Sequence, residues 1–167
     1  MRRRRTPSDP PADTSSTAIR AAALRLLGRR DYTRTELRSK LTTRGYPGDV
    51  VNDVLTQLAA DRLVDDRRAA DAHVRTASRV KGRGRQRIAR ELTARGVDAE
   101  VAAQALGQIS PDDERAALRR VLARTPLPSH PTPAERRRVF QRLVRRGFSI
   151  DLVVKMLRYG ADPDRED

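Results

Sequence analysis

The sequence predicts an all-α protein made of three tandem three-helix units, about nine helices in all. Hydrophobic residues make up 37% of the chain and aromatic residues only 3%, so the core must be built from Leu, Val, Ile and Ala. Such a core suits packed helices, whereas a β-sandwich favours β-branched and aromatic side chains. A pattern that recurs three times and the lack of sustained apolar–polar alternation also favour helices.

The recurring pattern consists of residues 37–55, 88–106 and 139–157, which align without gaps. Leu41, Leu92 and Leu143 are equivalent, with a spacing of 51 residues (92 − 41 and 143 − 92). Repetition at this length indicates stacked supersecondary units. Each copy reads as a helix, a glycine stop and a second helix, and the glycine is expected to adopt the left-handed conformation that ends a helix. The glycines are Gly45, Gly96 and Gly147.

A third helix is predicted before each pair, at residues 16–29, 65–79 and 112–124. Paired aspartates open the second and third of these helices, where carboxylates cap the first turn and offset the helix dipole. We therefore assign Asp65 and Asp66 to capping. Two capping boxes of the form T-x-x-E begin later helices, at residues 33–36 and 132–135.

These elements divide the chain into three units between two tails. Met1 to Arg5 and the following Pro, Ser and Asp residues predict a basic tail without fixed structure. The third unit contains a linker, TPLPSHPTP, that is too rich in proline to be helical. The predicted segments are the N-terminal tail 1–15, the units 16–62, 63–110 and 111–160 with their linker 125–133, and an acidic tail 161–167.

The charge of the chain points to an anionic partner. The formal net charge is +14, and arginine carries nearly all of it. Such a surplus attracts DNA, RNA or a carboxylate-rich protein surface. At 100° per residue, two helices gather arginines into a stripe opposite apolar side chains. The alternative is that the stripes are solvated faces that keep the protein soluble. They consist of Arg83, Arg87 and Arg90, and of Arg138, Arg142 and Arg145.

No arrangement of residues typical of an enzyme is present in the sequence. The chain has no cysteine, which excludes disulfides and thiolate metal sites and suits a reducing compartment. His73 and His130 lack metal-ligand spacing, and the GRGR stretch lacks the phosphate-loop pattern. We expect a non-enzymatic protein without cofactor or metal. No apolar run approaches the roughly 20 residues that span a bilayer, so we expect it in the cytoplasm.

The stretch LVDDRRAADAHVRTASRVKGRGRQRIARELTARGVDAEVAAQAL resembles the signature of the RecX family, and RRVFQRLVRRGFSIDLVVKML resembles the family's closing helix pair. The likeness covers residues 18–159. Val64 and Ala69 depart from the family pattern, which usually has Leu and an aromatic residue there. The matching positions are Leu63, Asp65, Asp66, Arg68, Ala70, Lys81, Gly82, Arg87, Ile88, Glu91, Leu92, Gly96, Arg146, Gly147 and Phe148.

The resemblance implies an elongated, curved array that binds along the groove of the RecA–DNA filament. It implies a regulator that modulates, and mostly inhibits, ATP hydrolysis and strand exchange by RecA in DNA repair and the SOS response. The sequence lacks the heptad pattern of apolar residues that would predict a coiled-coil dimer, so we expect a monomer. The alternative is a basic helical DNA-binding protein, for single- or double-stranded DNA, without a recombinase partner. We expect electrostatic docking through Arg79, Lys81, Arg83, Arg87, Arg90, Arg138, Arg142 and Arg145.

Overall fold

The computed structural model describes residues 13–125, 128 and 131–158, and this part of the chain contains nine α-helices, one π-helical segment and no strand. The all-α prediction is therefore confirmed. The predicted tails lie largely outside the described residues, as does part of the proline-rich linker. The helices are α1 (Ser16–Leu27), α2 (Arg34–Thr42), α3 (Gly48–Ala60), α4 (Asp66–Arg75), α5 (Arg85–Ala94), α6 (Ala99–Gly107), α7 (Pro111–Ala123), α8 (Pro133–Arg145) and α9 (Ile150–Arg158), with the π-helical segment at Thr76–Val80 between α4 and α5.

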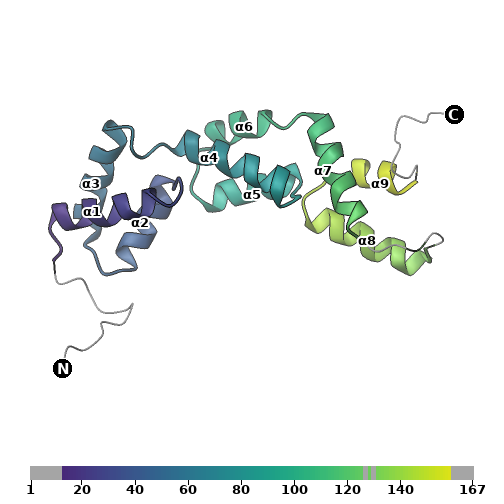
Figure 1. Ribbon diagram of the computed structural model, residues 1–167, viewed down its shortest axis with the longest axis horizontal. Helices are drawn as coiled ribbons and strands as arrows, with labels where there is room; N and C mark the ends of the chain where they lie inside the picture. The colour runs from purple at the N-terminus through teal and green to yellow at the C-terminus, as the bar shows by residue number, and fades with distance from the viewer. Residues whose placement is uncertain (1–12, 126–127, 129–130, 159–167) are drawn as a thin grey trace, which may run out of the picture.

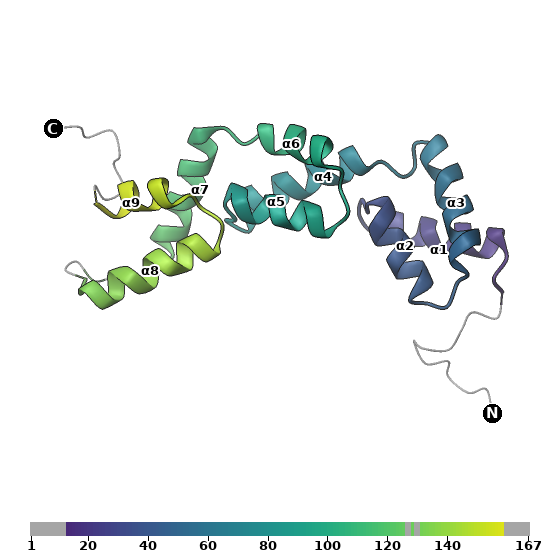
Figure 2. The same cartoon turned by 180° about the vertical axis from the view of Figure 1, so that it is seen from behind.

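The helices form three units in an elongated row, with α4–α6 between α1–α3 and α7–α9 in both views (Figures 1 and 2). Each unit has its own apolar core, and the equivalent leucines Leu41, Leu92 and Leu143 are fully buried, one in each core. Val64, which follows the predicted end of the first unit, is buried in the core of that unit. Because each unit has only a small core, contacts between neighbouring units also contribute to the stability of the array.

The helix boundaries follow the predicted capping residues. Thr33 and Glu36 form a complete capping box at α2, and Thr132 and Glu135 form another at α8. The three glycines at the helix stops all have positive φ angles, as predicted: 87° at Gly45, 72° at Gly96 and 90° at Gly147.

The first and second units meet where the start of α2 contacts the end of α5. The hydroxyl of Thr33 donates a hydrogen bond of 2.6 Å to the carbonyl oxygen of Arg95. The backbone N–H of Arg34 donates to Oδ1 of Asp66 at 2.7 Å. Asp65 caps α4 as predicted, through the N–H of Arg68. Asp66 has a different role from the predicted one, because its carboxylate joins two units.

One contact between the second and third units joins the positions that lie 51 residues after Thr33 and Arg95, and a second contact lies beside it. The N–H of Gly84 donates to the carbonyl oxygen of Arg146 at 2.8 Å, and the N–H of Arg85 donates to Oε1 of Glu114 at 3.1 Å. Gly84 is equivalent to Thr33, and Arg146 to Arg95. The sequence repeat therefore extends to the joints between units, which we call the first joint and the second joint.

Candidate functional site

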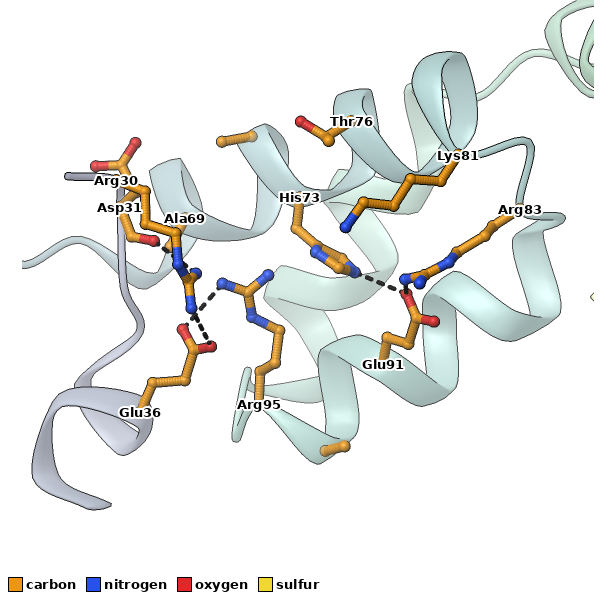
Figure 3. Close-up of a pocket in the computed structure, with 12 residues that line it drawn as sticks. Arg30, Asp31, Glu36, Ala69, His73, Thr76, Lys81, Arg83, Glu91 and Arg95 are labelled. Carbon is orange, nitrogen blue, oxygen red and sulfur yellow. Dashed lines mark hydrogen bonds and ion pairs between the residues drawn. The ribbon is translucent and has the colours of Figure 1, made fainter. Parts of the chain in front are cut away.

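The first joint encloses a pocket of about 620 Å³ in which acidic and basic side chains pair (Figure 3). Glu36 of α2 accepts hydrogen bonds from Arg95 at 2.9 Å and from Arg30 at 3.1 Å. Burial alone would raise the pKa of Glu36, but the Thr33 N–H and these two arginines hold the pKa below its usual range. The ionised carboxylate of Glu36 thus ties two units together.

A second charged group in this pocket is centred on Glu91 of α5 (Figure 3). Its carboxylate contacts Arg83 at 2.6 Å, Arg87 at 2.9 Å and Nε2 of His73 at 3.0 Å. Burial opposes ionisation, but hydrogen bonds from these three side chains keep the pKa of Glu91 low. Burial and the charge of Arg95 lower the pKa of His73, which favours the neutral imidazole.

These contacts correct the predicted arginine stripe of the second unit. Because α5 begins at Arg85, Arg83 lies ahead of the helix and cannot follow its 100° spacing. Arg83 and Arg87 are both partly buried against Glu91, which offsets their charge. Arg90 is exposed. The sequence alone could not reveal that a single glutamate lies between two of the three arginines.

The arginines of the third unit lie as the helical spacing predicted. Arg138, Arg142 and Arg145 are exposed along α8, whereas Val139 and Leu143 of the same helix are buried. In the described residues, no ion pair joins any of these three arginines to a carboxylate. This face of α8 is therefore available to an anionic partner.

A second pocket, of about 460 Å³, lies at the second joint and is lined by basic side chains. The structure brings three of the predicted docking residues together there, namely Arg79, Lys81 and Arg142. None of its described lining residues is acidic. The sequence reasoning missed the other three cations, although two of them are four residues apart, at the end of the helix predicted over residues 112–124, and so lie on one face. They are Arg120, Arg124 and Arg146.

Other kinds of site find little support in the described residues. No three His, Cys, Asp or Glu side chains there lie close enough together to hold a metal ion. None of the helices in the described ranges is long and apolar enough to cross a membrane. Asp112 and Asp113, the second aspartate pair, are used locally. Asp113 completes a capping box with Ser110, and Asp112 pairs with Arg115.

Comparisons with known proteins place this arrangement in a family. The model of the first three-helix domain of RecX matches residues 20–58, and that of the second matches residues 65–106. Regulatory protein RecX of Halorhodospira halophila is 41% identical over 162 residues, which covers 93% of this chain and 95% of that protein. The chain belongs to the RecX family. Regulatory protein RecX of Mycobacterium ulcerans is 38% identical over 170 residues, with 96% of this chain and 98% of that protein covered.

Solved structures of RecX proteins share the fold. The crystal structure of RecX from Lactobacillus salivarius matches with a TM-score of 0.71 and covers 86% of this chain and 95% of that chain, at 24% identity. A second crystal structure, of a regulatory protein RecX, matches with a TM-score of 0.69 over 89% of this chain. The row of three-helix units is thus the RecX fold, and the resemblance seen in the sequence is confirmed.

Proposed function

We propose that this RecX-family chain is a non-enzymatic regulator that binds in the groove of the RecA–DNA filament in the cytoplasm. There it lowers ATP hydrolysis and strand exchange by RecA, as part of DNA repair and the SOS response. The curated relatives are named regulatory proteins, which supports a regulatory role. The proposal extends that role to a partner and a mechanism.

The observation that carries the proposal is the distribution of basic groups along the row of units. Arg90 is exposed on the second unit, the basic pocket lies at the second joint, and exposed arginines follow α8 of the third unit. A helical filament offers a long, continuous binding surface, which an elongated repeat can follow over more than one subunit. A compact protein with a single basic patch would meet only one site.

The experiment that tests the proposal is the ATP hydrolysis of RecA on single-stranded DNA, titrated with this protein at two salt concentrations. Loss of hydrolysis at less than one protein per RecA subunit supports filament binding. Loss only at ratios that coat the DNA would indicate a basic protein that competes for DNA, and would contradict the proposal.

A matched pair of variants tests the role of α8. We expect Arg138→Gln with Arg145→Gln to raise the concentration needed for half-inhibition about 2- to 30-fold, because exposed ion pairs contribute about 0.2–1 kcal/mol each. The control, Arg25→Gln with Arg67→Gln, removes the same charge from exposed positions in α1 and α4. Equal inhibition by both variants would mean that the α8 face is only solvated.

A further inference from the structure

The pocket at the second joint brings six cationic side chains together with no acidic residue among its described lining residues. It is lined by segments of the second and third units: the π-helical segment and the loop after it, helix α7, helix α8 and the turn that ends α8. Uncharged groups complete its wall, with Val80, Gly82, Val121 and Thr125 among them. Its six cationic side chains are Arg79, Lys81, Arg120, Arg124, Arg142 and Arg146.

The backbone around the pocket is shaped to hold this arrangement. A π-helical segment is rare and often occurs at functional sites, and here it carries Arg79 and Val80 to the surface, where Val80 is 74% exposed. Gly82 follows with a φ of 57°, and a Cβ atom at Gly82 would lie 2.6 Å from Cγ2 of Val121. The loop can therefore approach α7 this closely only with glycine at position 82.

Arg146 fastens the third unit to this loop. Its Nη1 donates hydrogen bonds to the carbonyl oxygens of Lys81 at 3.2 Å and Gly82 at 3.3 Å. These contacts fix the positions of the two backbone segments that carry the cations. The positive groups are thus held together by the fold before any ligand binds, which lowers the entropic cost of binding.

The comparison with the first joint shows that the carboxylate paired with arginine there has no counterpart among the described lining residues of this pocket. In the first joint, Arg95 pairs with Glu36. The equivalent positions in the second joint, 51 residues later, are Arg146 and Arg87, so no glutamate faces Arg146 there, and Arg87 itself pairs with Glu91. Hydrogen bonds from Ser110, and the charges of Arg79 and Arg120, lower the pKa of Asp113, but Asp113 does not line the pocket.

We infer that the pocket at the second joint binds phosphate groups of a nucleic-acid backbone. Six cations in one pocket match a polyanion with closely spaced charges, and duplex DNA carries one charge per about 1.7 Å of its axis. Arginine suits this role because its planar guanidinium binds phosphate through two hydrogen bonds. No aromatic side chain is among the described lining residues, so binding is independent of base sequence.

This inference rests on the proposed function for its meaning in the filament. It divides the basic surface of the protein into two parts. The pocket at the second joint takes DNA phosphates, while the outer arginines Arg138 and Arg145 remain for the protein component of the filament. The two parts can be tested separately, because DNA binding can be measured without RecA.

The test uses Arg120→Gln with Arg124→Gln in the full chain, and Arg25→Gln with Arg67→Gln as the control. Both variants change the formal net charge from +14 to +12 (14 − 2). Binding to fluorescein-labelled oligo(dT), and to a labelled duplex of the same length, is measured over a range of salt concentrations. Circular dichroism checks that both variants keep their helices, and poly-L-glutamate serves as a carboxylate competitor.

We expect the pocket variant alone to bind DNA more weakly and with a smaller salt dependence. The slope of log K against log salt should fall by about 1.8 on duplex and about 1.4 on single strands, because each phosphate contact contributes about 0.9 or about 0.7. Arg120→Lys with Arg124→Lys should restore the slope, since lysine retains the charge. A larger loss on one form of DNA identifies the form that the pocket prefers.

The inference is overturned if the folded pocket variant keeps the slope of the control, or if the unaltered chain does not bind DNA. Displacement by poly-L-glutamate as potent as displacement by DNA would also overturn it, in favour of an acidic protein surface. Failure of the proposed function looks different. The pocket variant would still lose DNA binding, but the unaltered chain would not slow ATP hydrolysis by RecA at substoichiometric ratios.

Discussion

Replacement of Gly84 by alanine should open the second joint without disturbing the helix that follows. Gly84 is the N-cap residue of α5, with φ −77° and ψ 161°, a conformation that any residue adopts. A Cβ atom there would nevertheless overlap the carbonyl group of Gly147 and the amide nitrogen of Phe148. These are backbone atoms of the neighbouring unit and cannot rotate away, so the two units must separate.

The expected cost follows from the contacts that this separation breaks. Two hydrogen bonds cross the joint here: Gly84 N–H to the oxygen of Arg146 at 2.8 Å, and Gln86 N–H to the oxygen of Gly147 at 3.1 Å. Each contributes a net of about 0.5–1.5 kcal/mol, and overpacking adds about 1–3 kcal/mol. The restricted unfolded chain offsets about 0.4–1 kcal/mol. We expect Gly84→Ala to lower the free energy of unfolding by about 1–6 kcal/mol.

Urea denaturation followed by circular dichroism measures this change, and small-angle X-ray scattering detects loosening of the row. Gly107→Ala is a matched control, since Gly107 lies in α6 with no atom within 4 Å of the added Cβ. The control should gain about 0.5–1 kcal/mol from the better helix propensity of alanine. If Gly84→Ala were as stable as the control and scattered identically, close packing at residue 84 would not hold the units together.

Two further predictions concern the first joint. Gly45→Ala and Gly96→Ala both place alanine at a positive φ, which costs about 1–2 kcal/mol. Gly96→Ala should cost about 1–3 kcal/mol more in urea denaturation, because its Cβ would also overlap Thr35 of the neighbouring unit; equal losses would contradict this account. Burial and the charge of Arg95 lower the pKa of His73 in the folded protein, so the unfolded chain takes up a proton at His73 first as the pH falls. The free energy of unfolding should therefore decrease below about pH 6.5. The stability is complete above the unfolded pKa and is lost as the pH falls towards the folded pKa; His73→Gln should flatten this part of the pH profile, and an unchanged profile would assign the dependence to other groups.

Much of the fold could be predicted because its signals are local. Leu92 lies four residues after Ile88, and this helical spacing predicts that both face a core. Gly96 follows α5 and adopts the positive φ that ends the helix, which depends on that residue alone. Both signals recur every 51 residues, so each copy supported the others. The same reasoning predicted the exposed arginines of α8, since Val139 and Leu143 fix the buried side of that helix.

The joints could not be predicted in the same way, because they depend on which surface of one unit meets the next. Asp66 was assigned to capping from its position at a helix start, yet its carboxylate accepts from Arg34 of another unit. Arg83 was assigned to a helical stripe, yet it lies ahead of α5 and binds Glu91. Arg120 lies in α7 and Arg124 caps its C-terminal end, and only the packing of the third unit on the second brings them to Lys81.

The repeat also explains how one architecture supports two different joints. Both joints use the carbonyl groups of equivalent residues, Arg95 and Arg146, and the same helix start, although the donor is the Thr33 hydroxyl in the first joint and the Gly84 N–H in the second. Among the side chains that differ between the two joints, Glu36 and its equivalent Arg87 have opposite charges. With glutamate, the guanidinium of Arg95 pairs with a carboxylate inside the protein. With arginine, the guanidinium of Arg146 turns to the loop carbonyls and the surrounding cations stay open to a ligand. This change of charge is one difference between a joint held by an internal ion pair and the joint that we propose binds phosphate.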